Sequence, residues 1–114
     1  MSTADKTYNG WTNYETWAVM LHLDNDEGTY TMVRDSVAEI VASRNEAGGR
    51  GEQPFYASYV ADWLKDYAET LCGVGSESED YGIPEPTLLA TDMIRAALSE
   101  VDWNEMASHV LSES

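Results

Sequence analysis

The chain has 114 residues, and its 21 acidic side chains against 6 basic ones give a formal net charge of −15 at pH 7. Such acidity opposes contact with nucleic-acid phosphates and favours a basic protein surface, with association that is fast and sensitive to salt. The length and the hydrophobic fraction of 43% fit a single domain over residues 1–114 with its own core, and no stretch is apolar for long enough to span a membrane.

The N-terminal end predicts a cytoplasmic protein. Residues 1–10 form a polar lead-in without the apolar region of a secretory signal. The single cysteine, Cys72, cannot close an internal disulfide, which suits a reducing compartment.

The first predicted helix begins at a capping box. Thr12-Asn13-Tyr14-Glu15 places Thr12 at the N-cap and Glu15 at the third helical position. An inward apolar face follows at helical spacing and comprises Tyr14, Trp17, Ala18 and Leu21. We expect this helix to end near residues 24–26, where short polar side chains favour a turn.

Two longer helices are predicted in the middle of the chain. One covers about residues 28–45 and ends before the glycine-rich turn at 48–51. The next begins at Pro54, which suits a first helical turn, and ends before Gly73, a natural C-cap. It has the clearest apolar stripe in the chain, made of Tyr56, Tyr59, Val60, Trp63, Leu64, Tyr67 and Leu71.

The last third of the chain contains an acidic loop and two further helices. Residues 73–85 form the loop, and Pro86 is expected to begin the fourth helix. Asp102 and Glu105 repeat the capping-box pattern at the start of the last helix. Because no alternating apolar pattern suggests a sheet, the sequence predicts an all-α fold, a compact bundle of four to five short helices.

Motifs for chemistry are weak, and we expect no enzyme activity, metal site or cofactor. Residues 24–28 resemble the start of a calcium loop, but Gly28 falls at position five instead of six, and Asp35 stands at position twelve where the pattern has Glu. His109 lies one turn from Glu105 and Glu113, which favours a salt-bridged surface histidine over a metal ligand. Cys72 ends a helix, where the dipole disfavours a thiolate, and is interpreted as a packing residue.

One segment carries a specific resemblance. Residues 8–17, with the sequence YNGWTNYETW, continue into Leu21-His22-Leu23-Asp24-Asn25-Asp26. This segment resembles a family of small uncharacterised proteins of phages, plasmids and scattered bacteria and archaea. The C-terminal Val101-Asp102-Trp103 is also similar to the end of that family's sequences. The resemblance implies a mobile-element setting, and hence the host cytoplasm, but no activity. The motif residues are interpreted as mainly structural, namely Trp11, Thr12, Asn13, Tyr14, Glu15 and Trp17.

The acidity is uneven along the chain. Residues 62–113 contain 12 acids and two bases, whereas residues 1–61 contain nine acids and four bases. We therefore expect a partner-binding acidic face built from Asp62, Asp66, Glu69, Glu77, Glu79, Asp80, Glu85, Glu100, Asp102 and Glu105. Such a face could act as a decoy for DNA, because enzymes of host defence carry basic nucleic-acid grooves.

These patterns lead to one main functional hypothesis and one alternative. The main hypothesis is an acidic binding protein of a mobile element that inhibits a basic, nucleic-acid-binding defence complex of the CRISPR or restriction type. Its partner would be a basic protein surface, with no direct contact to nucleic acid or membrane. The alternative is an accessory protein without mimicry, whose acidity reflects solubility or high-salt adaptation, and which could form a homodimer through exposed aromatics.

Overall fold

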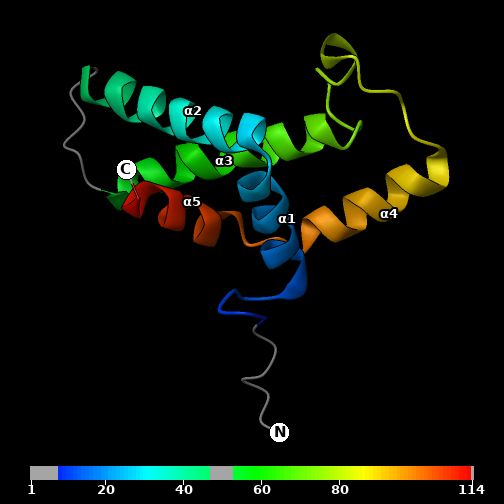
Figure 1. Ribbon diagram of the computed structural model, residues 1–114, viewed down its shortest axis with the longest axis horizontal. Helices are drawn as coiled ribbons and strands as arrows, with labels where there is room; N and C mark the ends of the chain where they lie inside the picture. Colours follow the sequence, from blue (N-terminus) through cyan, green and yellow to red (C-terminus); the bar gives the residue numbers. More distant parts are fainter. Residues whose placement is uncertain (1–7, 47–52, 114) are drawn as a thin grey trace, which may run out of the picture.

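The structure is a computed structural model that describes residues 8–46 and 53–113. It confirms the all-α prediction, because every longer element over these residues is a helix (Figure 1). The elements are α1 (Tyr14–Asn25), α2 (Glu27–Glu46), α3 (Gln53–Leu71), the short 3-10 helix η2 (Glu79–Tyr81), α4 (Leu88–Ser99) and α5 (Trp103–Ser112). Most of the predicted N-terminal lead-in and the glycine-rich turn at 48–51 lie outside the described residues.

The core lies between α1, α2, α3 and α5. Its fully buried side chains include Met20 of α1, Val33 and Val37 of α2, Leu64 of α3 and Met106 of α5. Burial of a side chain of this size contributes roughly 1.5–3 kcal/mol, so these residues dominate the stability of the bundle. In α5, Met106, Ala107, Val110 and Leu111 are all buried, and Trp103 is partly buried against them.

The inward face predicted for α1 is wrong. Tyr14 is 54% exposed and Leu21 is exposed as well, whereas the buried residues of α1 are Thr16, Met20 and Leu23. Both sets have helical spacing, because α1 carries apolar side chains on most of its sides. Burial of Thr16 is inexpensive here, because its hydroxyl is fully hydrogen-bonded, as described below.

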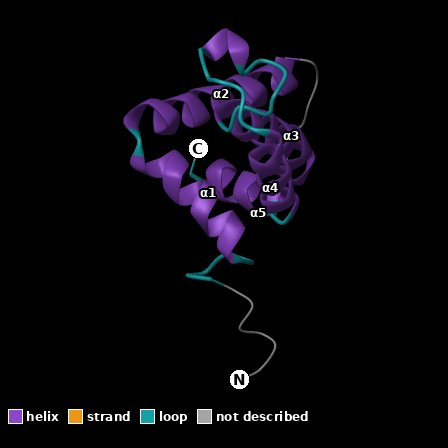
Figure 2. Ribbon diagram, turned by 90° about the vertical axis from the view of Figure 1, so that its right-hand side faces the viewer, coloured by secondary structure: helices purple, strands orange, loops and turns teal. Residues whose placement is uncertain are grey.

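The connection between α3 and α4 is folded against the end of α3. Ser78 is buried, and its hydroxyl donates to the Thr70 carbonyl (2.8 Å) and accepts from the Gly75 N–H (3.1 Å). Gly73 ends α3 as predicted, with φ +86°, and a Cβ at this position would meet the Pro84 carbonyl oxygen at 2.9 Å. Figures 1 and 2 show this connection on the side of the molecule opposite residues 8–13.

The fourth helix begins later than predicted. It begins at Leu88 rather than at Pro86, because Thr87 is the N-cap and its hydroxyl accepts from the Ala90 N–H (3.1 Å). Its C-terminal end meets the body through the buried Leu98. The rest of α4 diverges from α3, so the helix stands out at the side of the molecule (Figure 1).

Candidate functional site

The N-terminal motif binds the connection between α4 and α5, and we call this contact the α1–α5 seam. The Asn13 side chain donates to the Glu100 carbonyl (2.6 Å), and the Thr12 N–H donates to Glu105 (3.0 Å). The buried Thr16 hydroxyl accepts from the Asp102 N–H (2.8 Å). The seam therefore joins residues more than 80 positions apart in the sequence, and this explains the polar part of the motif as a structural element.

The cap predicted for α1 is wrong by one residue. Asn13, not Thr12, is the N-cap, since its side-chain oxygen accepts from the Thr16 N–H (2.9 Å) and from the Thr16 hydroxyl (2.6 Å). Thr12 lies outside the helix, because its N–H is used across the seam by Glu105. The predicted cap of α5 is confirmed, since the Asp102 side chain accepts from the Glu105 N–H (3.0 Å).

The aromatic residues of the motif gather at the surface. The ring centroids of Tyr8, Tyr14 and Trp17 lie 4.8–5.6 Å from one another, with Tyr8 held by a tight backbone bridge to Trp11. Trp11 contacts His109 edge-on at 5.0 Å. We call Tyr8, Tyr14 and Trp17 the aromatic cluster. Its Tyr14 was predicted in the core, and that prediction is wrong because packing rotates the other side of α1 inward.

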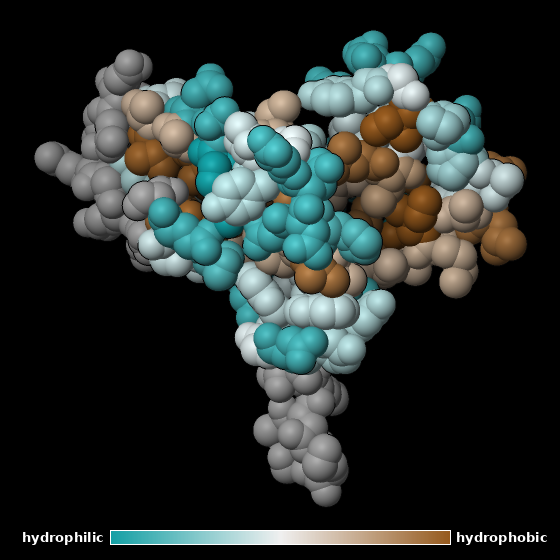
Figure 3. Space-filling model, in the orientation of Figure 1, coloured by the Kyte–Doolittle hydropathy of each residue, from teal (hydrophilic) through white to brown (hydrophobic). Residues whose placement is uncertain are grey.

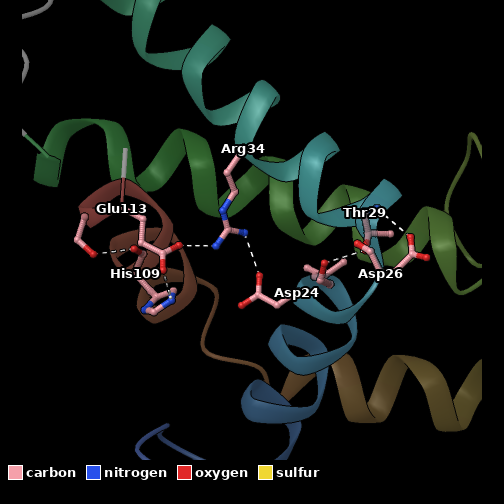
Figure 4. A network of polar contacts seen from close by, with 8 residues as sticks. Asp24, Asp26, Thr29, Arg34, His109 and Glu113 are labelled. Carbon is pink, nitrogen blue, oxygen red and sulfur yellow. Dashed lines mark hydrogen bonds and ion pairs between the residues drawn. The ribbon is translucent and has the colours of Figure 1, made fainter.

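A polar network joins three helices near the C-terminal end (Figure 4). Arg34 of α2 lies between Asp24 of α1, at 3.0 Å, and Glu113 just after α5, and its guanidinium also lies over the Tyr30 ring. The His109 Nε2 lies 3.3 Å from the Glu113 carboxylate, so the two side chains are neighbours on one face of α5, as predicted. Sequence reasoning missed Arg34, because nothing local pairs it with residues 10 and 79 positions away.

The acidic turn between α1 and α2 has a structural role. Asp24 is engaged by Arg34, and the Asp26 side chain accepts from the Thr29 N–H (3.0 Å) at the start of α2. Over the described residues, no group of three or more histidine, cysteine or acidic side chains is arranged to hold a metal ion. The resemblance of residues 24–28 to a calcium loop is thus explained by helix capping and an ion pair.

The predicted acidic face separates into two parts. Asp102 and Glu105 are partly buried and take part in the seam, so they are engaged within the chain. The others lie at the surface. Glu100 is exposed between α4 and α5, and the rest belong to α3 or to the segment after it, namely Asp62, Asp66, Glu69, Glu77, Glu79, Asp80 and Glu85.

Three of these carboxylates meet in one place. Asp66 and Glu69 of α3 line a hollow of about 140 Å³ together with Glu77 of the following loop. The loop is positioned by the hydrogen bonds of the neighbouring Ser78, described above. In the part of the chain that the structure describes, none of the three forms an ion pair, and no lysine or arginine lines the hollow.

Two further hollows share lining residues with the first, and we call the surface that the three hollows occupy along α2, α3 and the following loop the acidic groove. A second hollow of about 290 Å³ shares Asp66 and Glu77 with the first and includes Trp63, Tyr67 and Tyr81. A third, of about 450 Å³, shares Trp63 and Asp66 and is lined further by Glu39, Ile40, Ser43, Arg44 and Tyr59. Sequence reasoning found Asp66, Glu69 and Glu77, but it could not find Glu39, because the predicted face was confined to the acidic second half of the chain.

Aromatic rings form one wall of the acidic groove. Trp63 and Tyr67 are stacked, with centroids 4.9 Å apart and planes at 19°. Burial raises the pKa of the Tyr67 hydroxyl, and the nearby Tyr81 and Asp26 raise it further, so the hydroxyl is neutral at physiological pH. At the far end, the guanidinium of Arg44 lies 4.4 Å from the centre of the Tyr59 ring. The groove thus combines negative charge with faces that bind cations.

A separate apolar cavity of about 220 Å³ opens between α1, α3 and the end of α4. Apart from His22, its lining is apolar or weakly polar, and it comprises Ala18, Val19, Leu23, Ala68, Leu71, Cys72 and Leu98. Figure 3 shows hydrophobic atoms gathered on the side of the molecule where α4 and the end of α3 lie. Cys72 is exposed rather than packed in the core, and partial burial of its thiol, with Glu69 nearby, raises its pKa.

Comparison with known proteins supports the resemblance only in general terms. Residues 4–53 match the profile of a family of unknown function (DUF7249). The match spans the YNGWTNYETW segment, α1 and α2, somewhat less than half of the chain, and is consistent with an uncharacterised family. No curated protein and no solved structure matches the chain. No helix among the described residues is long and apolar enough to cross a membrane.

Proposed function

We propose that this protein is an acidic binding protein that accepts a basic surface of another protein in the acidic groove. One observation carries the proposal. Asp66, Glu69 and Glu77, from two elements, surround a single hollow, while no base within the described part of the chain pairs with them. By contrast, Arg34 forms ion pairs with two other acids, Asp24 and Glu113.

The chemistry of the groove favours arginine and lysine side chains. A carboxylate accepts a guanidinium through two parallel hydrogen bonds, and such charge-assisted bonds are about twice as strong as neutral ones. An adjacent aromatic face adds roughly 0.5–2 kcal/mol for a cation above it. The pairing of Arg44 with the Tyr59 ring within the same groove shows that its walls accommodate a guanidinium.

The geometry supports competition for a few basic side chains more directly than imitation of a whole duplex. Carboxylates at positions 62 and 66 of α3 lie about 6 Å apart along the helix axis. Phosphates follow one another at about 3.4 Å of axis per DNA strand. The charge of α3 is therefore sparser than that of DNA, and Glu77, Glu79 and Asp80 are needed to extend it.

The family resemblance of the N-terminal segment indicates a class of partner. The N-terminal segment resembles proteins of phages and plasmids, and in that setting a basic, nucleic-acid-binding partner is a host defence complex of the CRISPR or restriction type. Binding would inhibit the complex by occupying a surface that otherwise holds nucleic acid. The protein would act in the cytoplasm of the host cell, without a cofactor and without catalysis of its own.

The aromatic cluster supports a second candidate function, that of an accessory protein without mimicry. Tyr8 and Tyr14 are 40% and 54% exposed, and exposed tyrosine and tryptophan are common anchors of protein interfaces. A partner held mainly by this cluster would bind with little dependence on salt, because the contact would be apolar.

A capture experiment separates the two functions. The immobilised protein is incubated with a lysate of a host that carries CRISPR and restriction systems, and bound proteins are eluted with rising salt. The groove proposal expects subunits of such a complex, eluted by salt and lost with Asp66→Lys plus Glu77→Lys. The matched control, Asp35→Lys plus Asp92→Lys, makes the same change in net charge outside the groove and should retain the partner. A partner that resists salt and is lost with Tyr14→Ala would instead establish the accessory function.

A further inference from the structure

The helix α4 exposes an apolar stripe that nothing in the described chain covers. Leu88, Leu89 and Met93 are 84%, 74% and 64% exposed, more than the other large hydrophobic residues whose burial is described. Leu89, Met93, Ala96 and Ala97 follow at i, i+4, i+7 and i+8, so they share one side of the helix. The opposite side faces the body, where Leu98 is buried and Arg95 donates to the Val74 carbonyl (3.2 Å).

The charge of α4 sets it apart from the other α-helices. It contains one acid, Asp92, and one base, Arg95, whereas each of α1, α2, α3 and α5 contains more acids than bases. Two copies of a chain with a net charge of −15 repel one another, so they can meet only where local charge is low. The apolar stripe of α4 lies on such a region.

The stripe is also complementary to itself. In an antiparallel pair of helices related by a twofold axis at Met93, Leu89 of one copy lies opposite Ala97 of the other. Each Leu89 then meets an alanine, and the two Met93 side chains meet at the axis. Ala96 and Ala97 allow the helices to approach closely, and large residues opposite small ones give good packing.

From these observations we infer that α4 is a homodimerisation helix, whose Leu89, Met93, Ala96 and Ala97 stripe pairs antiparallel with the same stripe of a second copy. The inference is independent of the acidic groove, which lies along α2 and α3. A single helix pair buries less than a standard interface, so the dimer is weak. Added salt strengthens it, because it screens the repulsion between the acidic bodies.

Sedimentation velocity of the full chain over a range of concentrations, at low and high salt, tests the inference. We expect a monomer–dimer equilibrium that shifts toward dimer with salt. Met93→Asp should weaken it by at least tenfold, while Met32→Asp, which places the same charge at an exposed methionine of α2, should leave the dimer intact. Far-UV circular dichroism verifies that both variants keep their helices. A wild-type chain that stays monomeric at millimolar concentration and high salt, or a dimer that survives Met93→Asp, would overturn the inference.

A reciprocal exchange tests the register of the pair. Leu89→Ala alone removes the large residue, and Ala97→Leu alone places two large residues opposite one another, so each should weaken the dimer. The double variant restores a large residue opposite a small one and should recover dimerisation to within a few-fold of the wild type. A double variant as weak as the weaker single variant would show that the helices do not pair in this way.

Discussion

The α1–α5 seam and the acidic groove both contain acidic side chains, but the two regions differ in whether those side chains have partners within the chain. In the seam, the polar groups of Asn13, Thr16, Asp102 and Glu105 are all engaged within the chain. In the groove, Asp66, Glu69 and Glu77 share a hollow with no basic partner among the described residues. Carboxylates satisfied within the chain indicate a structural role, whereas gathered and unneutralised ones are available to a partner.

The acids of the seam and those of the groove also differ in their contact with water. The seam fixes the two ends of the described structure to each other, and its acids are partly buried because backbone and side-chain donors reach them. The groove acids remain in contact with water, where mutual repulsion is screened. Substitutions in the seam should therefore change stability, and substitutions in the groove should change binding.

The largest effect on stability is expected for Thr16→Val. The substitution keeps the shape of the fully buried side chain but removes the acceptor of the Asp102 N–H. A donor left without its partner in a buried place costs about 1–3 kcal/mol. Urea unfolding followed by tryptophan fluorescence measures the change. Thr31→Val, on the exposed side of α2, is the control and should change the unfolding free energy by less than about 0.5 kcal/mol.

A somewhat smaller loss of unfolding free energy is expected for Asn13→Ala. The variant removes the N-cap of α1 and the bond to the Glu100 carbonyl, and loss of an N-cap typically costs about 1 kcal/mol. Thr12→Ala removes only a long contact of 3.5 Å to Asp102, so its effect should be small. Equal losses of unfolding free energy in the two variants, or a larger loss for Thr12→Ala, would show that Asn13 is not the residue that caps α1.

Charge reversal in the groove should leave stability almost unchanged. Asp66→Lys plus Glu77→Lys replaces two exposed carboxylates and relieves repulsion around the hollow, so the unfolding free energy should stay within about 0.5 kcal/mol or rise. Thermal and urea unfolding measure it. A loss of 2 kcal/mol or more, on the order expected for a buried network, would mean that these acids support the fold.

The smallest expected effect concerns the reactivity of Cys72. Partial burial, and then Glu69, raise the pKa of its thiol, which lowers the thiolate fraction at any pH below that pKa. The folded protein should thus react more slowly with iodoacetamide at pH 8 than the urea-unfolded chain does. Glu69→Gln should speed the reaction modestly in the folded state, and an unchanged or slower rate would contradict the assigned cause.

The helices could be predicted from the sequence where local signals agree with packing. The α2 helix begins and ends within a residue of its predicted bounds, and Asp102 caps α5 as expected. The start of α1 could not be predicted in the same way. Thr12 and Asn13 are both good caps, and the choice depends on Glu100 and Glu105, far along the chain. Tertiary contact therefore decides between neighbouring local signals.

The candidate site could be predicted only in part. The spacing of Asp66 and Glu69 on α3 follows from helical periodicity, so these residues were expected on one side. That they line one hollow with Glu77 depends on the buried Ser78 hydroxyl, and that Asp66 lines another with Glu39 depends on how α2 packs on α3. Neither contact has a local signature. The exposure of the α4 stripe was missed for the same reason, because an amphipathic pattern does not say what covers it.

Titration of a fluorescently labelled oligo-arginine peptide with the wild type and two charge-reversed variants tests the central claim most directly. The account predicts that Asp66→Lys plus Glu77→Lys weakens binding at least roughly tenfold, which corresponds to about 1.4 kcal/mol. Asp35→Lys plus Asp92→Lys, with the same net charge, should weaken it by less than about threefold. Equal losses in the two variants would show that total charge, and not the acidic groove, attracts basic partners, and would contradict the account.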